Sequence, residues 1–398
     1  MASPQIANSV WCDRINTMEL PLSVLGNELL MEALDSVMSG KRVTIELGVR
    51  LHNHAPLPGL AALAKLIKSS RYGDHVFFNE NLHVNTTNIC TLACRFCAFR
   101  RGSRNEEAYA LSAEEFVSRI EPFAESIDEV HAVGGLHPEW TASDYAQLFR
   151  LTKDRFPHIS IKSLTAVEIK HIASRSGLST FETLRKLNQA GLDSLPGGGA
   201  EILVDSIRDR ICRGKESSSD YLRIHGEAHE LGMPTNCTML FGTIESVENR
   251  ITHLDLLRRQ QDATRGFQCF VPYPFLPDKT RLPEANLATA EEIIRVISIS
   301  RILLDNIPHI KAYRMNIGDH LATIAINSGA DDIDGTVGHE EIMREAGSNT
   351  RADYRGDDLA RLVSSSGLTP VLRNSDYSLL TEYYQSEAIK VRHLPIAG

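Results

Sequence analysis

Eight short β-like runs alternate with amphipathic helical segments over about residues 83–337, and no other feature of the sequence restricts the fold as strongly. Helices fill the intervals, as in residues 111–125, where Ser112 precedes acidic residues in a first turn. Alternation of this kind predicts a parallel sheet. The runs are LHVNTTNI (82–89), DEVHAVG (128–134), HISIKSLT (158–165), LDSLPG (192–197), PTNCTMLFG (234–242), GFQCFVP (266–272), HIKAY (309–313) and DDIDGTV (331–337).

The number and spacing of these runs predict an α/β fold of the (β/α)8 TIM-barrel type, because about 250 residues is the usual size of that barrel. An open doubly wound sheet is the alternative, but it requires a Gly-rich turn after its first strand, where this chain has cysteines. We expect three parts. These are a helical N-terminal segment over residues 1–80, the barrel over 81–337, and a mostly helical C-terminal extension over 338–398.

Bulk properties exclude several classes of partner. The 398 residues carry a net charge of −9, which argues against a nucleic-acid-binding surface. No run of about 20 apolar residues predicts a membrane span, and the N-terminal sequence lacks the basic start and apolar core of a secretion signal. The seven cysteines are too unevenly spread for a disulfide framework. We therefore expect a cytoplasmic protein without membrane or nucleic-acid partners.

Unusual residues gather where the predicted strands end, whereas the helix-to-strand connections are plainer. In a barrel, all strand ends meet on one face, which carries the active site. Turn formation explains any one of these segments, but the asymmetry predicts a shared site. The segments are GGLHPE (134–139), TAVE (165–168), PGGGAE (196–201), GTIE (242–245), PYPF (272–275), RMNIG (314–318) and GTVGHE (335–340).

Cys90, Cys94 and Cys97 follow the first predicted strand closely. A structural zinc ion needs four ligands, usually from two CxxC pairs, and the chain offers no second pair. Three thiolates on one short loop suit a [4Fe–4S] cluster with one iron left open for a ligand. A redox pair of Cys94 and Cys97 leaves Cys90 unexplained, and three unrelated buried thiols are the plainest alternative.

The CxxxCxxC spacing, with Phe96 before the last cysteine, resembles the motif of the radical S-adenosylmethionine (SAM) superfamily. The resemblance implies that the open iron binds SAM and that one electron cleaves it to a 5′-deoxyadenosyl radical. It assigns the cluster to Cys90, Cys94 and Cys97, and it places Phe96 beside the adenine.

Two further segments match SAM-binding motifs of that superfamily. Gly134 and Gly135 match the glycines after the second strand, whose backbone binds the methionine amino group, although Leu136 replaces the usual acidic residue. The fifth-strand motif near the adenine is matched loosely, with Thr in place of its first Gly, by Thr238, Leu240, Gly242 and Glu245.

Longer segments, over about residues 45–347, resemble the aminofutalosine synthase family of the futalosine route to menaquinone. In that family the adenosyl C5′ adds to the enol-ether double bond of 3-[(1-carboxyvinyl)oxy]benzoate, and rearrangement with loss of carbon dioxide gives 6-amino-6-deoxyfutalosine. SAM is a consumed substrate, and a flavodoxin or ferredoxin is the expected reductant. The oligomeric state stays open, a homodimer included. The matching segments are GGLHP, IKSLTAVEI, AGLDSLPGGGAEI, RGFQCFVP, LDNIPHIKAY and GADDIDGTV.

The two carboxylates of that substrate need partners, and the predicted strand ends offer several. PGGGAE is expected to open a helix whose free N–H groups could hold an anion, with a plain strand-to-helix turn as the alternative. The cationic side chains of Lys311 and Arg314 could add charge-assisted hydrogen bonds to the carboxylates. The expected substrate ligands are Gly197, Gly198, Gly199, Glu201, Lys311 and Arg314.

His137 and Glu168 are the expected catalytic residues. His137 could donate a proton, with an ordinary loop histidine as the alternative. Glu168, like Glu201, could meet the substrate or the SAM ribose, with a helix-start acid as the alternative.

Arg314 and Thr243 depart from the family pattern, which has Trp after the HIKAY tyrosine and His after the glycine of the fifth-strand motif. The PYPF segment differs as well. Since these positions lie at strand ends, a different acrylate-like acid could be the acceptor. The dehypoxanthine futalosine cyclase and the FO synthase subunit share the scaffold, but DSLPGGGAEI and HIKAY favour the synthase. Outside enzymes, a non-catalytic metal-binding scaffold is the alternative.

Overall fold

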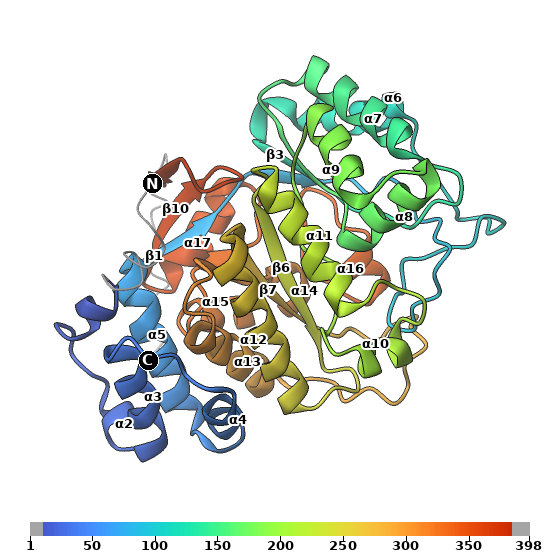
Figure 1. Cartoon of the computed structure of the whole chain (residues 1–398). Coiled ribbons are helices and arrows are strands. Elements are labelled where there is room, and N and C mark those ends of the chain that lie inside the picture. The colour runs from blue at the N-terminus through green and yellow to red at the C-terminus, as the bar shows by residue number, and fades with distance from the viewer. Residues whose placement is uncertain (1–10, 384–398) are drawn as a thin grey trace, which may run out of the picture.

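The structure is a computed structural model that describes residues 11–383, and its centre is a barrel of parallel strands (Figure 1). Each of the eight predicted runs contains a strand, so the predicted α/β barrel is confirmed. The barrel strands are β2 (Asn81–His83), β3 (Glu129–Ala132), β4 (Ser160–Ser163), β5 (Leu192–Ser194), β6 (Thr235–Phe241), β7 (Phe267–Pro274), β8 (His309–Ala312) and β9 (Asp332–Ile333).

Two irregular contacts close the ring. Neighbouring strands pair in parallel from β2 to β5 and from β6 to β9. A parallel bridge between Leu195 and Thr235 joins the two sheets on one side. On the other side, the His83 N–H donates to the Val337 carbonyl at 2.8 Å, and the Asn81 side chain accepts from the Val337 N–H at 3.0 Å. Both sheets therefore lose an exposed edge, as in a closed barrel.

Helices fill the connections, and many begin with a polar side chain that accepts from a free N–H group. Ser112 forms a capping box with Glu115 at the start of α6, as its position in the sequence predicted. The helices are α6 (Ala113–Ile120), the 3-10 helix η1 (Glu121–Ser126), α7 (Ala142–Arg155), α8 (Ala166–Ser176), α9 (Thr180–Gln189), α10 (Asp205–Ile211), α11 (Ser218–Glu230), α12 (Val247–Thr264), α13 (Ala290–Leu303), α14 (Arg314–Ile317) and α15 (Asp319–Ile326).

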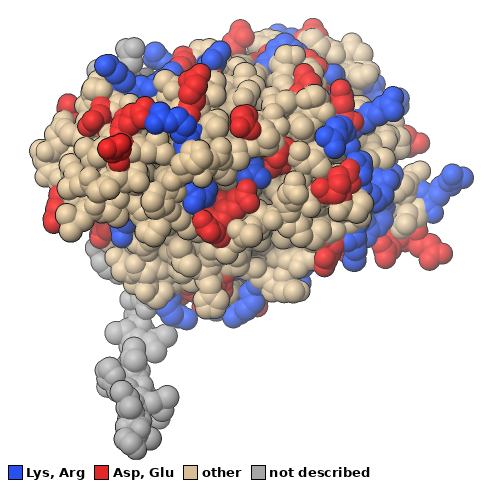
Figure 2. Space-filling view, turned by 90° about the horizontal axis from the view of Figure 1, so that it is seen from below, with Lys and Arg blue, Asp and Glu red and all other residues tan. Residues whose placement is uncertain are grey.

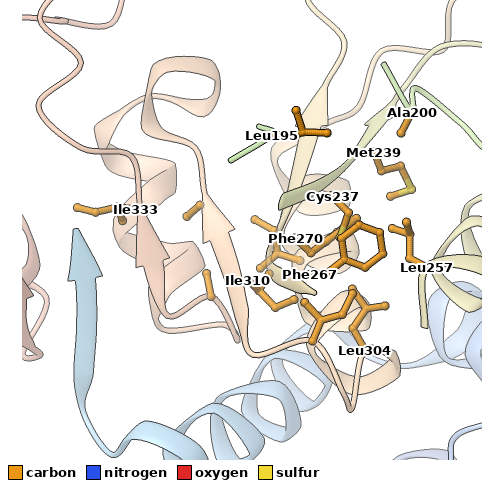
Figure 3. Close-up of a cluster of buried hydrophobic side chains, with 14 of the residues drawn as sticks. Leu195, Ala200, Cys237, Met239, Leu257, Phe267, Phe270, Leu304, Ile310 and Ile333 are labelled. Carbon is orange, nitrogen blue, oxygen red and sulfur yellow. The ribbon is translucent and has the colours of Figure 1, made fainter. Parts of the chain in front are cut away.

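Apolar side chains fill the space between the strands and the helices. In Figure 3, Phe267 and Phe270 of β7 lie with Ile310 of β8, Leu257 of α12 and Leu304 at the end of α13. All five side chains are fully or almost fully buried. Burying a large apolar side chain contributes about 1.5–3 kcal/mol, so this layer holds the helices against the strands.

The N-terminal helices cover one side of the barrel (Figure 1). They are α2 (Leu22–Leu25), α3 (Glu28–Met38), α4 (Ile45–His54) and α5 (Leu57–Tyr72). α4 packs against α12 and α5 packs against α13. The strand β1 (His75–Phe78) then leads into β2 and pairs with β9.

The C-terminal extension differs from the mostly helical segment that the sequence predicted. Over residues 338–383 it contains α16 (Ile342–Glu345), α17 (Gly356–Ser365) and two strands, β10 (Thr369–Arg373) and β11 (Leu380–Glu382). β10 pairs in parallel with β1, which lies almost 300 residues earlier in the chain. Such a pairing leaves no local periodic signal, because each strand is short and its partner is remote in sequence. Residues 384–398 lie outside the described part of the chain.

The turn between β10 and β11 closes one end of the barrel, its floor, with buried charged side chains. Arg373 donates from Nε to Asp332 at 2.6 Å, and Tyr377 donates to the same carboxylate at 2.7 Å. Lys311 pairs with the other Asp332 oxygen at 2.6 Å. Burial opposes the ionisation of Asp332, but Arg373 and Lys311 hold its pKa at about 2. The floor is thus closed by paired charges instead of apolar side chains.

Acidic and basic side chains are interspersed over most of the face in Figure 2. Among residues 11–383, no helix combines the length and the apolar character needed to cross a membrane.

Removing Arg373 should destabilise the fold, because Asp332 would stay buried with one cation instead of two. We expect R373M to lower the free energy of unfolding by about 3 kcal/mol in urea titrations. R361M is the matched control, since Arg361 is half-exposed on α17 and pairs only with Asp358; its effect should stay within about 0.5 kcal/mol. Equal losses in the two variants would contradict the floor's role.

Candidate active site

A cavity of about 280 Å³ opens at the carboxyl ends of the barrel strands. Every strand end or the loop after it contributes to the wall, so the asymmetry seen in the sequence reflects one shared site. The wall is lined, among others, by Cys90, Cys94, Phe96, Cys97, Arg100, Gly134, Gly135, Thr165, Gly198, Gly199, Glu201, Lys215, Thr238, Leu240, Tyr273, Tyr313, Asn316 and Glu340.

The three cysteines of the loop after β2 share this wall. Burial raises the pKa of the Cys94 thiol to about 12, with Lys215 opposing, and burial also raises that of Cys97. Buried thiols of this kind ionise when a bound metal supplies the compensating charge. No three His, Cys, Asp or Glu side chains in residues 11–383 converge as they would around a single ion. The fit to an iron–sulfur cluster therefore rests on three free thiols along one wall.

Neighbouring segments hold the cysteine loop in place. The Arg95 N–H donates to the Ile211 carbonyl at 2.8 Å, and the Arg95 side chain pairs with Glu284 at 2.6 Å. Arg281 donates to the Ala93 carbonyl at 2.8 Å. The loop is thus fixed by both α10 and the segment before α13.

Gly134 and Gly135 lie against the backbone that leads into the cysteine loop. A Cβ at Gly135 would lie 2.2 Å from the Ile89 carbonyl oxygen, and one at Gly134 would lie 2.6 Å from Thr86 Oγ1. The Gly135 N–H donates to the Thr87 carbonyl at 2.7 Å. Both glycines line the cavity, and no described residue donates to their carbonyl oxygens. These oxygens could accept an ammonium group of a ligand.

Glu168 was expected to be catalytic, but its side chain is hydrogen-bonded within the fold and does not line the cavity. One carboxylate oxygen accepts from the Gly134 N–H at 3.0 Å, and the other accepts from the Thr165 N–H and hydroxyl, each at 2.7 Å. The side chain is buried and lies off the cavity wall. Burial raises the pKa of Glu168 to about 7, with these hydrogen bonds opposing. Its contacts connect the helix cap of α8 to the double glycine.

Phe96 and Glu201 meet at Lys215, a residue that sequence analysis missed. The Lys215 ammonium lies 5.6 Å from the centroid of the Phe96 ring and forms an ion pair with Glu201. Burial opposes its charge, but Glu201 and Glu216 raise the pKa of Lys215 above its ordinary value. The loop between α10 and α11 carries no motif that singles this lysine out.

The glycines of PGGGAE do not open a helix. Helix α10 begins only at Asp205, and Glu201 has a left-handed backbone with φ +47°. Gly197 packs beneath the wall, where a Cβ would lie 2.3 Å from the Asn236 carbonyl oxygen. Gly198 and Gly199 do line the cavity. The predicted helix N-terminal anion site is therefore wrong, because Glu201 turns the chain away from the α conformation before α10.

The fifth-strand motif divides into two parts. Thr238 and Leu240 line the cavity, whereas Gly242 and Glu245 do not. Glu245 accepts from the Gly242 N–H at 2.7 Å and pairs with Arg250 at 2.7 Å. It shapes the turn after β6 instead of touching a ligand.

Three further expected site residues lie away from the cavity wall. His137 stacks on Trp140 at 4.7 Å and does not line the cavity. Lys311 is part of the barrel floor with Asp332. Arg314 is fully buried, donates to the Arg351 carbonyl at 2.7 Å and lies 4.1 Å over the Tyr354 ring. These predictions are wrong because the side chains find structural partners within the fold.

The cavity wall also holds polar groups that the sequence did not reveal. His83 Nδ1 lies 2.9 Å from Glu340, and the Tyr313 hydroxyl donates to the same carboxylate oxygen at 2.9 Å. Burial opposes the ionisation of Glu340, but His83 holds its pKa at about 2. His131 stacks on His83 at 4.4 Å, and burial lowers its pKa to about 3, so it is neutral.

Comparisons with known proteins agree with this geometry. Residues 84–257 match the radical SAM superfamily, and residues 264–385 match the CofH/MqnC C-terminal region. Aminodeoxyfutalosine synthase from Thermus thermophilus is 38% identical over 364 residues, which cover 90% of this chain and 98% of that protein. The chain belongs to the radical SAM superfamily. Like other members of that superfamily, it is an enzyme that uses a [4Fe–4S] cluster and SAM.

Relatives with other activities share the scaffold. A 5-amino-6-(D-ribitylamino)uracil–L-tyrosine 4-hydroxyphenyl transferase from Methanoculleus marisnigri is 36% identical, covering 88% of this chain and 98% of its own. A cyclic dehypoxanthine futalosine synthase from Streptomyces coelicolor is 33% identical, covering 88% and 89%. The crystal structure of methylornithine synthase superposes with a TM-score of 0.65 at 18% identity, covering 84% of this chain and 96% of its own, which supports the barrel fold.

Membership in the radical SAM superfamily confirms the resemblance that the cysteine motif indicated. Both matched regions contribute residues to the cavity wall. The radical SAM region supplies the cysteine loop, the double glycine and Leu240, and the C-terminal region supplies Tyr273, Tyr313 and Glu340. Of the three departures from the family pattern, Arg314 and Thr243 lie off the cavity wall, whereas the PYPF segment lines it.

Replacing Glu168 should weaken SAM binding without removing the chemistry. We expect E168Q to raise the KM for SAM about tenfold, equivalent to about 1.4 kcal/mol for a weakened hydrogen bond, with kcat within about threefold. Steady-state turnover under anaerobic conditions measures both. A catalytic acid or base would instead lose about a hundredfold or more in kcat. E182Q is the control, since Glu182 forms the same capping box on α9 away from the cavity.

Proposed function

We propose that this enzyme transfers the 5′-deoxyadenosyl group of SAM to 3-[(1-carboxyvinyl)oxy]benzoate. Rearrangement and loss of carbon dioxide would then give 6-amino-6-deoxyfutalosine in menaquinone biosynthesis. The proposal is carried by the 38% identity to aminodeoxyfutalosine synthases from Thermus thermophilus and Streptomyces coelicolor, each matched over about nine-tenths of the chain.

The cluster and SAM supply one-electron cleavage of the sulfonium, and the chain's own residues handle binding and orientation. Gly134 and Gly135 offer carbonyl oxygens to the methionine ammonium group. Phe96, beneath the Lys215 ammonium, offers a ring face to the adenine. A mostly apolar wall limits the contact of water with a reactive carbon radical. In this proposal Lys215 and the double glycine orient SAM, while the other end of the cavity receives the acceptor.

The acceptor end suits an aromatic acid. Tyr273 and Tyr313 meet edge-to-face at 5.1 Å, and Phe275 lines the same part of the wall. Aromatic side chains bind an aryl ring through offset and edge contacts. His83, hydrogen-bonded to Glu340, is the group best placed to hold or move a proton there. It replaces His137 in that role.

We also propose a cytoplasmic enzyme that takes its electron from a flavodoxin or ferredoxin. All seven cysteines are free thiols, as expected in a reducing compartment. A homodimer stays an untested expectation.

Product analysis tests the proposed reaction. The protein is reconstituted anaerobically with iron and sulfide and incubated with SAM, dithionite and the enol-ether benzoate. Mass spectrometry should then detect 6-amino-6-deoxyfutalosine. Release of 5′-deoxyadenosine as the sole adenosyl product would instead assign the chain to a hydrogen-abstracting activity and overturn the proposal.

Cysteine variants separate the cluster from the other thiols. C94S should lose the iron–sulfur absorbance and all SAM cleavage, because two thiolates cannot hold the cluster in place. C12S is the control, since Cys12 lies near Arg71 in the N-terminal region, away from the cavity, and should keep both properties. Iron retention and turnover in C94S would contradict the assignment.

A further inference from the structure

We propose that Arg100 binds a carboxylate of the acceptor acid. This inference rests on the proposed function and deepens it, because it names the residue that recognises the acceptor. Arg100 lies three residues after the last cysteine of the loop and lines the cavity. Arg100 belongs to none of the motifs described above and was not among the expected site residues.

The charge balance of the wall points to this arginine. Lys215 is paired with Glu201, and His83 is paired with Glu340. His131 is neutral, since burial lowers its pKa to about 3. Among the described residues of the wall, Arg100 is therefore the remaining cation, and it has no carboxylate partner. A dicarboxylic acceptor brings the negative charge that this part of the cavity lacks.

The hydrogen bonds of Arg100 are incomplete. Its Nη2 donates to the Cys90 carbonyl at 3.3 Å, a long contact, and its Nε is buried without any partner. A guanidinium carries five donors in a planar fork that matches a carboxylate. A buried donor without a partner costs free energy, which a bound anion recovers. This incomplete hydrogen bonding leaves donors of the Arg100 guanidinium available to a ligand.

The next residue shows what an internally satisfied arginine looks like in the same loop. Arg101 donates to the carbonyls of Ala98 and Phe99 and pairs with Glu107 and Glu345. It does not line the cavity. Arg101 therefore stabilises the fold, whereas Arg100 keeps donors with which to bind a ligand.

Arg100 also belongs to the part of the loop that is next to α16. The pairing of Arg101 with Glu345 at 3.0 Å brings this part of the loop against α16. Phe99, Ile342 and Met343 line the wall there and supply apolar contacts for an aryl ring. Lys215, by contrast, lies over Phe96 at the end assigned to SAM. An aryl acid with its carboxylate on Arg100 would keep its ring among these apolar side chains.

Binding measurements on the reconstituted enzyme test the role of Arg100. In the presence of SAM and without reductant, R100Q should weaken binding of the enol-ether benzoate 30- to 100-fold in anaerobic calorimetry. R100K should lose less, because it keeps the charge but not the planar fork. The KM for SAM and the rate of acceptor-free SAM cleavage should stay within threefold of wild type. R104Q is the matched control, an exposed arginine of the same loop that does not line the cavity.

Two monomethyl esters of the acceptor identify the bound carboxylate. If the ester blocks the carboxylate that Arg100 binds, its affinity for wild type should be low and should fall little further in R100Q. The other ester keeps that carboxylate free, so R100Q should lower its affinity as much as it lowers that of the diacid. Iron content and visible absorbance equal to wild type show that R100Q is intact.

Three outcomes would overturn the inference. If an intact R100Q binds the acceptor as tightly as wild type, and wild type forms the adduct normally, Arg100 does not bind the acceptor and the proposed function still holds. A rise in the SAM KM instead of the acceptor Kd assigns the arginine to SAM. Failure of the wild-type enzyme to bind the acceptor overturns both proposals.

Discussion

The contact between the double glycine after β3 and the backbone after β2 is the constraint on which the site depends. Gly135 approaches so closely that a Cβ would lie 2.2 Å from the Ile89 carbonyl oxygen. This approach sets the cysteine loop beside the second strand end, where SAM must meet the cluster. Glu168 reinforces the arrangement from the next strand by accepting the Gly134 N–H. A side chain at either glycine would push the loop away from the cavity.

The cavity joins two surfaces of different chemistry. One wall, from the radical SAM region, carries thiols, glycines and the Lys215–Glu201 pair. The C-terminal region contributes Tyr273, Tyr313 and Glu340, and Glu340 pairs with His83 at the end of β2. Relatives between 33% and 38% identical bear different names, so one scaffold of this kind hosts more than one activity.

Sequence analysis predicted the barrel correctly. The cysteines, Gly134 and Gly135 that it selected line the cavity, whereas most of its charged candidates do not. The cysteines and this double glycine stand out in the sequence because they follow strand ends at a characteristic spacing. Arg314 and Lys311 also lie after or within β8, but the fold supplies Asp334, Asp332 and Arg351 as their partners. Lys215 and Arg100 were missed because a charged loop residue looks the same whether it faces solvent or a cavity.

The sequence by itself determined the order of the barrel strands and of the helices between them, since hydrophobic periodicity and helix caps are local properties. It also determined the cluster chemistry, because three thiols within one loop restrict the metal that they can bind. Only the tertiary structure decided which charges are available to a ligand. Several buried ions are paired with residues that are remote in the chain, such as Glu340 for His83 and Asp332 for Arg373. Those distances are set by barrel closure, which no local pattern encodes.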